Sequence, residues 1–195
     1  MLDALLELLQ AEFRIADLQF ARKLADILLE QFEDKEKGGF FFTGLDHEQL
    51  IHRPKHGHDQ AMPAGNGIAA FALQRLGFLL GESRYLIAAE RTLKLFYPAL
   101  AQHPAGFSSM LTTLQEHLKP PRIIILRSTS GGSQAWHRAL LRRYMPDTMI
   151  LTVEGPATEL PSALAKPLSA EANAWICEGT HCSPPINDLE QLLRS

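Results

Sequence analysis

The stretch Pro120-Pro121-Arg122-Ile123-Ile124-Ile125-Leu126 divides the sequence into a helical part and a part that contains strands. Two consecutive prolines cannot extend a helix, and they force the preceding backbone into an extended conformation. The β-branched run that follows them is typical of a buried strand. We therefore expect two domains, a helical domain over residues 1–119 and a small α/β domain over residues 122–195.

Apolar residues before the two prolines recur at helical spacing. The predicted helices run from Leu2 to Phe13, from Leu18 to Phe32, from Gly65 to Gly81, from Ser83 to Phe96 and from Pro104 to Leu118. Ser83 is expected to cap the fourth helix with its hydroxyl, and Pro104 to open the fifth. The pattern thus predicts five helices before the first strand.

Strand and helix patterns alternate after the prolines. A helix is predicted from Gln134 to Tyr144, a second strand from Met149 to Val153, a third from Ala174 to Cys177 and a closing helix from Asp188 to Leu193. The strand–helix–strand order is that of a βαβ unit. We expect a three-stranded, mostly parallel sheet, and the fold class is α plus α/β.

The composition is that of a folded globular chain. Of the 195 residues, 46% are hydrophobic and 21% are charged, and the formal net charge is −3. The basic residues are scattered, which argues against nucleic acid as a partner. No apolar run is long enough to cross a bilayer, so no membrane partner is expected. Two cysteines do not indicate a disulfide framework, and we expect a reducing, cytoplasmic setting.

An ordered series of motifs carries a family resemblance. The motifs are Gly38-Gly39-Phe40-Phe41-Phe42, Arg53-Pro54-Lys55, Asp59, Pro63-Ala64-Gly65-Asn66, then Leu76, Gly81, Tyr85, Ala89-Glu90, Cys177 and Cys182-Ser183-Pro184-Pro185. Together they resemble the C-terminal part of the thioredoxin-domain-containing proteins of the spermatogenesis-associated, thioredoxin-like type. The resemblance implies part of a six-hairpin α/α toroid, similar to that of N-acylglucosamine 2-epimerases and certain glycosidases.

The resemblance covers nearly all of this sequence but only about the last third of a full-length member. It implies a truncated or split member that lacks the thioredoxin-like domain and the first hairpins of the toroid. The family usually has serine where Ala64 and Gly67 stand here, so any role of those hydroxyls is lost. A likeness of fold is also a weak basis for assigning a reaction.

The irregular stretch from Leu50 to Pro63 contains the first candidate site. In a toroid such a loop lines the mouth of the central funnel, where Arg53, Lys55, Asp59 and Asn66 are expected to bind a saccharide or an anion. The structural alternative is that Asp59 pairs with Arg53 or Lys55 while Asn66 caps the following helix. Both interpretations remain open on the sequence.

Three histidines, His52, His56 and His58, lie in the same stretch. Imidazoles transfer protons near neutral pH, so His56 and His58 are candidate catalytic residues, with Asp59 to orient one of them. Their spacing matches no metal-binding motif, and we expect no metal and no cofactor. Solvated loop histidines explain the pattern equally well.

Cys177 and Cys182 enclose four residues and are redox candidates. Dithiols of the thioredoxin kind have two intervening residues at the start of a helix, so this is not a thioredoxin site. Gly179 would let the loop fold back into a bridge, and His181 would let the pair join a metal site. Two idle thiols are the expectation for a reducing compartment.

The turn Ser128-Thr129-Ser130-Gly131-Gly132-Ser133 joins the first strand to a helix. Backbone amides at such a position bind phosphate or carboxylate in some proteins, but neither a dinucleotide-binding fingerprint nor a P-loop lysine is present. A βα turn with a serine cap is the expectation, and Trp136 and Trp175 are expected in the core or at an interface of the small domain.

Two functional hypotheses follow. In the first, the chain is a non-catalytic interaction module that forms homo-oligomers or pairs with the missing N-terminal half. Five helices are too few to close a ring of about twelve, and the open ends would leave apolar stripes to cover. In the second, it is a carbohydrate-binding or sugar epimerase, isomerase or glycosidase-like enzyme that uses the loop of residues 52–66.

Overall fold

The computed structural model describes residues 1–48, 51–129, 131–156, 158, 160–179 and 181–195. They form two compact units, which are described separately. The helical unit consists of Met1–Leu6, Gln19–Gly77 and Glu82–Lys119. The sheet unit consists of Glu7–Leu18, Phe78–Gly81 and Pro120–Ser195. Leu50 and Ser130, two residues of the predicted loops, lie outside the described residues.

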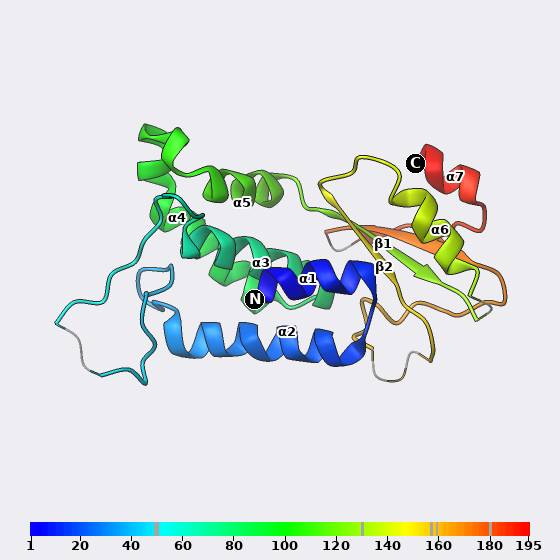
Figure 1. Cartoon of the computed structure of the whole chain (residues 1–195), viewed down its shortest axis with the longest axis horizontal. Coiled ribbons are helices and arrows are strands. Elements are labelled where there is room, and N and C mark those ends of the chain that lie inside the picture. The colour runs from blue at the N-terminus through cyan, green and yellow to red at the C-terminus, as the bar shows by residue number, and fades with distance from the viewer. Residues whose placement is uncertain (49–50, 130, 157, 159, 180) are drawn as a thin grey trace. The chain divides into compact units, whose positions relative to one another are not determined.

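Five α-helices precede the first strand in the described part of the chain (Figure 1). They are α1 (Leu2–Ala11), α2 (Ile15–Ile27), α3 (Gly65–Leu80), α4 (Ser83–Gln102) and α5 (Ser108–Leu118). The prediction of five helices from apolar periodicity is confirmed. Tight packing between α4 and α5 places Leu93, Leu100, Phe107 and Met110 in one buried cluster.

The ends of the helices differ from the sequence predictions. The second helix does not continue as α-helix to Phe32, because Leu28–Phe32 adopts a π-helical turn. Ser83 lies inside the first turn of α4, and the cap residue is Glu82, which makes no side-chain cap bond. The predicted cap by Ser83 is therefore wrong. Pro104 opens a short 3-10 turn, and α5 begins only at Ser108.

The sheet unit has four strands among the described residues, in the order β2-β1-β3-β4. The strands are β1 (Arg122–Arg127), β2 (Thr148–Thr152), β3 (Asn173–Glu178) and β4 (His181–Cys182). Strand β1 pairs in parallel with β2 and antiparallel with β3, and β3 pairs antiparallel with β4. The α plus α/β class is confirmed, but the sheet is mixed rather than three-stranded and mostly parallel.

The reason for the antiparallel β3 lies in the connection that precedes it. A parallel return to the same sheet requires a crossover, usually a helix. The described residues between β2 and β3 form turns and contain Pro156, Pro161 and Pro167, so they supply no crossover helix. The chain therefore enters β3 at the end of the sheet where β2 finishes, and β3 runs antiparallel to β1.

Strand β1 is buried on both faces. On one face, Ile124 and Leu126 pack in a cluster with Leu140 of α6 (Ser133–Leu140) and Leu192 of α7 (Leu189–Arg194). Trp136 packs against this cluster, whereas Trp175 is itself buried in β3. Each fully buried aliphatic side chain contributes about 1.5–3 kcal/mol, so this core stabilises the sheet.

No helix in the described residues is both long enough and apolar enough to cross a bilayer. The longest, α4, has 20 residues but carries Arg84, Glu90, Arg91 and Lys94. Closure of the helices into a toroid stays a prediction.

Candidate functional site

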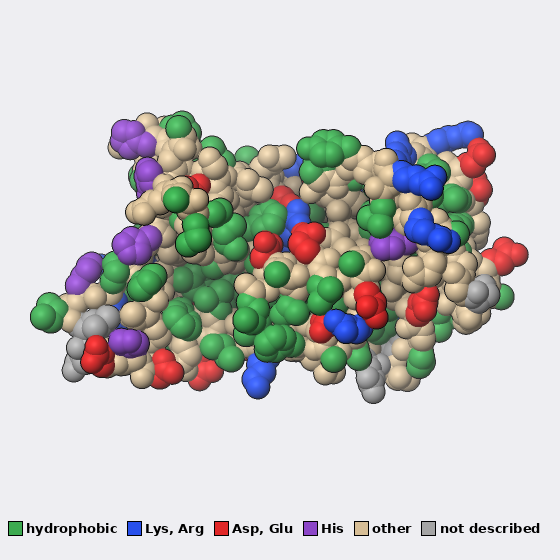
Figure 2. Space-filling model, in the orientation of Figure 1, with side chains coloured by type: hydrophobic (Ala, Val, Ile, Leu, Met, Phe, Trp, Pro, Cys, Tyr) green, Lys and Arg blue, Asp and Glu red, His purple; other side chains and the backbone are tan. Residues whose placement is uncertain are grey.

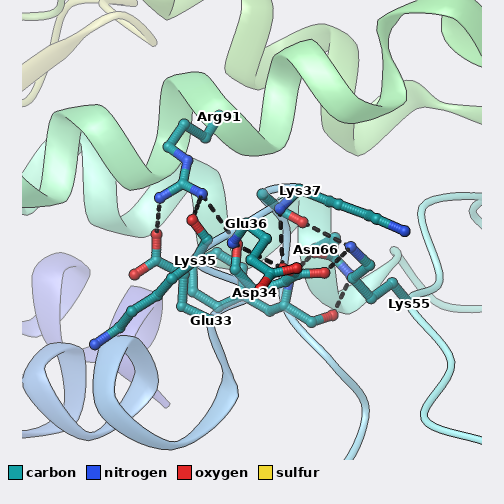
Figure 3. A network of polar contacts seen from close by, with 10 residues as sticks. Glu33, Asp34, Lys35, Glu36, Lys37, Lys55, Asn66 and Arg91 are labelled. Carbon is teal, nitrogen blue, oxygen red and sulfur yellow. Dashed lines mark hydrogen bonds and ion pairs between the residues drawn. The ribbon is translucent and has the colours of Figure 1, made fainter.

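The glycine turn after α2 is held by a network of charged side chains (Figure 3). Gly38 and Gly39 have φ angles of 79° and 75°, a region that side chains with a Cβ rarely adopt. Within the turn, the Asp34 carboxylate accepts hydrogen bonds from the backbone N–H groups of Glu36 and Lys37, at 3.0 and 2.9 Å. This is an Asx-type turn, which fixes the reversal locally.

Lys55 ties the irregular loop to that turn. Its Nζ lies 2.7 Å from Oδ2 of Asp34 and 2.8 Å from the carbonyl oxygen of Gly38. Both side chains of the ion pair are mostly buried, with exposed fractions of 16% and 13%. The hydrogen bond from Lys55, opposed by burial but reinforced by the two N–H groups, lowers the pKa of the Asp34 carboxyl to about 2.

Arg91 of α4 braces the same turn from another element. Its Nη1 lies 3.2 Å from Oε1 of Glu33, and its Nη2 donates to the carbonyl oxygens of Asp34, at 3.2 Å, and Lys35. The guanidinium thus adds hydrogen bonds to the backbone of the turn, where the Asp34 carbonyl also accepts from the N–H of Gly38. Figure 3 shows Arg91 and Lys55 approaching the turn from opposite sides.

Asn66, at the start of α3, is buried and makes three hydrogen bonds to backbone groups. Its Oδ1 accepts from the N–H of Phe40 at 2.6 Å, and its Nδ2 donates to the carbonyl oxygens of Phe40 at 3.0 Å and His56 at 2.9 Å. Its amide therefore joins the glycine turn to the irregular loop. The prediction that Asn66 caps α3 is wrong, because its side chain is engaged with residues outside the helix.

Arg53 packs its guanidinium on the ring of Phe41, 4.2 Å from the centroid. Its Nη2 donates to the carbonyl oxygen of Thr43 at 2.5 Å, and Nζ of Lys55 lies 5.2 Å from the centroid of the same ring. The two cations therefore share one aromatic ring, as in a cation–π contact. They also line an open pocket of about 540 Å³ with Glu33 and Asp34.

Asp59 lies apart from these cations and holds two other segments. Its carboxylate accepts from the N–H of Ala64 at 2.7 Å, and from the hydroxyl and N–H of Ser109 at 2.5 and 2.8 Å. Burial alone would raise the pKa of this carboxyl, but the hydrogen bonds from Ser109 and Ala64 outweigh it and lower the pKa. The predicted pairing of Asp59 with Arg53 or Lys55 is wrong, because Asp59 instead binds the first turn of α5.

The histidines of the loop contact aromatic rings. His56 meets the edge of Phe42 with a centroid distance of 6.0 Å, and His58 meets Phe107 at 5.4 Å. His52 is exposed. Among the described residues, no three His, Cys, Asp or Glu side chains are grouped so as to hold a metal ion.

His58 and Asp59 border a second open pocket, of about 560 Å³. Its other lining groups include Asp3, Phe71, Ser109 and Thr112. Oδ1 of Asp3 is buried and has no hydrogen-bond partner in the described part of the chain. The four predicted ligand-binding residues thus divide between two places, with Arg53, Lys55 and Asn66 at the glycine turn and Asp59 at this pocket.

The two cysteines are joined in a disulfide, Cys177–Cys182. The expectation of two idle thiols is therefore wrong, and the alternative of a bridge across the loop at Gly179 is the arrangement found. Gly179 has a φ angle of 57°, which permits the tight reversal between β3 and β4.

The turn after β1 has a glycine at the cap position of α6, where a serine is expected. Gly132 is the cap residue of α6 and makes no side-chain cap bond. Gly131 has a φ angle of 75°, which glycine adopts more readily than other residues, and this angle permits the turn. The Ser128 hydroxyl lies 3.4 Å from the carbonyl oxygen of Ala170.

Similarity to known proteins covers both units of the chain. The human spermatogenesis-associated protein 20 is 26% identical over 197 aligned residues, which cover 94% of this chain and 25% of the human protein. The chain is homologous to spermatogenesis-associated protein 20. The rat protein of that name is 27% identical and the mouse protein 26%, each with 94% of this chain and 24% of the relative covered. No family model matches the chain.

This chain therefore spans about a quarter of the length of the relatives that it matches. The glycine turn, the irregular loop and the cysteine hairpin all belong to a sequence of which 94% aligns with spermatogenesis-associated protein 20.

Sequence reasoning missed several residues of these sites. Asp34 had a detectable signal, since an aspartate shortly before two glycines is typical of an Asx turn. Ser109 had none, because its partner Asp59 lies far away in the sequence. Asp3 had none either, because the other residues of its pocket are distant in the sequence. The Asp59–Ser109 contact joins residues separated by 50 positions.

Proposed function

We propose that this chain is a folded interaction module without a catalytic site of its own, and that its helical unit binds a protein partner through apolar side chains. The supporting observation is the exposure of seven large hydrophobic residues of that unit, each between 46% and 77% exposed. They are Phe20, Phe42, Leu45, Met62, Ile87, Tyr97 and Leu118. Covering exposed apolar side chains with a partner is favourable, because it removes their surface from water.

Figure 2 shows hydrophobic side chains gathered in a recess on one face, with histidine side chains close to it. A partner helix with an apolar stripe would fit such a surface, because binding would bury both the stripe and the exposed apolar side chains.

The partner that we propose is helical sequence of the kind adjoining the matched quarter in spermatogenesis-associated protein 20. In those relatives the matched quarter is continuous with about three further quarters of sequence, so its equivalent surface has more protein to pack against. A second copy of this chain offers a similar apolar surface and would replace that partner in its absence.

The polar residues of the irregular loop support the non-catalytic part of the proposal. Lys55, Asp59 and Asn66 all donate to, or accept from, groups of the chain itself. A substrate would have to compete with these hydrogen bonds, each of which is worth about 1 kcal/mol or more.

Sedimentation velocity at micromolar concentration, combined with binding of a dye specific for apolar surface, tests the proposal. We expect self-association or strong dye binding, and Phe42→Ser with Met62→Ser should reduce both. Tyr144→Ser, which removes a 92% exposed ring from the sheet unit, is the matched control and should change neither. A monomer that binds no dye would refute the proposal.

A second candidate function, binding of a saccharide, is favoured by the pocket that contains Asp3. Carboxylate and hydroxyl groups beside an aromatic ring are the groups that bind sugar hydroxyls and sugar faces, and Asp3, Thr112 and Phe71 supply them. In an epimerase-like reaction His58 would move the proton. The specific observation in its favour is that a carboxylate, a hydroxyl and an aromatic ring line the same pocket.

A panel of mono- and disaccharides tests this second candidate, because a ligand that binds the native state raises the melting temperature. Asp3→Asn should abolish the rise without unfolding the chain. Asp59→Ala is unsuitable, since loss of its bonds to Ala64 and Ser109 would itself destabilise the loop. Equal melting temperatures with and without every sugar would eliminate the candidate.

A further inference from the structure

The two sulfurs of the Cys177–Cys182 disulfide differ in their access to solvent. Cys177 is buried in β3, where it is 7% exposed and opposes Ile123 of β1. Cys182 is exposed in β4, directly opposite Cys177 in the strand register. A dissolved thiol would therefore reach the disulfide at the sulfur of Cys182.

A lysine lies against that exposed sulfur. Nζ of Lys166 is 3.1 Å from Sγ of Cys182. Partial burial, which removes water from around the charge, lowers the pKa of the Lys166 ammonium. A thiolate formed on Cys182 would offset that loss of hydration, because a nearby cation stabilises the charged form of a thiol.

The segment that carries Lys166 is attached to β1. Arg127, at the end of β1 and fully buried, donates to the carbonyl oxygens of Gly155 at 2.8 Å and Leu164 at 3.4 Å. The N–H of Lys166 in turn donates to the carbonyl oxygen of Leu164. These bonds fix the backbone of Lys166 relative to the sheet. The fold itself therefore holds the Lys166 side chain near Cys182.

We propose that Cys177–Cys182 is a redox exchange site for a dithiol, in which Cys182 is the sulfur attacked and Lys166 stabilises its thiolate. This inference does not depend on the proposed interaction function. Four residues separate the two cysteines, whereas two separate them in the thioredoxin motif, so the site would exchange electrons without that motif.

The exchange proceeds in two balanced steps. A thiolate of the dithiol attacks Sγ of Cys182, forms a mixed disulfide there, and Cys177 leaves as a thiolate. The second thiol of the reagent transfers its proton to Cys177 and attacks the reagent's own sulfur. This step releases the Cys182 thiolate beside Lys166. The dithiol becomes a disulfide, and the two cysteines gain two electrons.

The first experiment measures thiolate character in the Cys177→Ser variant, which leaves Cys182 free. Alkylation of Cys182 by iodoacetamide near neutral pH should be about threefold slower when Lys166→Met is added, because less thiolate is present. Lys166→Arg should restore the rate, and Lys23→Met, a lysine of the helical unit, is the matched control. Equal rates in all four proteins would overturn the role of Lys166.

The second experiment uses the wild-type chain with dithiothreitol and with glutathione. Dithiothreitol should reduce the disulfide without denaturant, and the oxidised reagent should re-form it. Glutathione, which has one thiol, should accumulate a mixed disulfide that peptide fragmentation locates on Cys182. Reduction only in denaturant, two free thiols after oxidation, or a glutathione adduct on Cys177 would each overturn the proposal.

Discussion

The irregular loop of residues 51–64 and the sheet are ordered by different interactions. In the loop, single side chains bind backbone groups, as when Asn66 joins Phe40 to His56. In the sheet, the backbone ladder and a shared apolar core hold β1 between β2 and β3. Order in the loop thus depends on a few polar atoms, whereas order in the sheet is distributed over many contacts.

The difference predicts which substitutions are costly. When one member of a buried hydrogen-bonded pair is removed, the other member stays buried without that partner. Its full desolvation cost then lowers the free energy of unfolding. Loss of one methyl group from a packed strand costs less, since the remaining contacts persist. The following predictions test this contrast, from the largest expected effect to the smallest.

Glu116→Ala should lower the free energy of unfolding by about 3–5 kcal/mol, because it leaves a buried guanidinium without its ion-pair partner. Nη2 of Arg75 lies 2.6 Å from Oε1 of Glu116, and their side chains are 8% and 6% exposed. Urea denaturation measures the change. Glu190→Ala is the control, since its pair with Arg194 is 76–80% exposed and should contribute under about 1 kcal/mol. Similar losses in both variants would contradict the claim that burial makes a polar partner costly to lose.

Asn66→Ala should cost about 3 kcal/mol in the same assay, because three hydrogen bonds to backbone groups are lost and two of them are buried. Asn187→Ala removes an exposed asparagine and is the matched control, expected to stay within about 0.5 kcal/mol of wild type. If Asn66→Ala were neutral, the loop would be held by something other than this amide.

The Asp34–Lys55 ion pair should make stability depend on acid pH. The pKa of Asp34 is about 2 in the folded chain, below the ordinary value, so the unfolded chain takes up its proton first as the pH falls. The contribution of the pair, on the order of 1–2 kcal/mol, is complete above about pH 4 and is lost between about pH 4 and pH 2.

Denaturation of wild type and Asp34→Asn across that pH range measures this effect. The variant should be less stable above about pH 4, and the two curves should converge near pH 2. Asp46→Asn, at an exposed aspartate of the same unit, should follow wild type. A constant difference between wild type and Asp34→Asn at all pH values would be inconsistent with the ion pair.

Ile124→Val, in the core of β1, should cost only about 1 kcal/mol, because one methylene group is removed from a well-packed cluster. Ile51→Val, at a fully exposed isoleucine, is the control and should have no measurable effect. A loss above about 3 kcal/mol for Ile124→Val would place the sheet in the same sensitive class as the loop.

The sequence predicted best what depends on local pattern. Helical periodicity located α1 to α5, and the β-branched run after Pro121 located β1. These signals lie within the elements themselves. The direction of β3 has no such signal, since the residues of Ala174–Cys177 favour a strand in either direction.

The candidate site was predicted less well, because its geometry depends on distant partners. Asn66 and Phe40 are 26 positions apart, and Asp59 and Ser109 are 50 apart. The residue types indicated a polar loop, but not which groups each side chain would bind. The disulfide likewise required the register of β3 and β4, which places Cys177 opposite Cys182.

The central claim is that the polar side chains of the loop bind the chain's own backbone. Hydrogen exchange of individual backbone amides in the free chain tests this claim most directly. The amides of Phe40, Ala64 and Ser109 donate to the side chains of Asn66 and Asp59. We predict that all three exchange slowly without any ligand, and that Asn66→Ala accelerates Phe40 most. Fast exchange of these amides that becomes slow only when a small molecule binds would contradict the account.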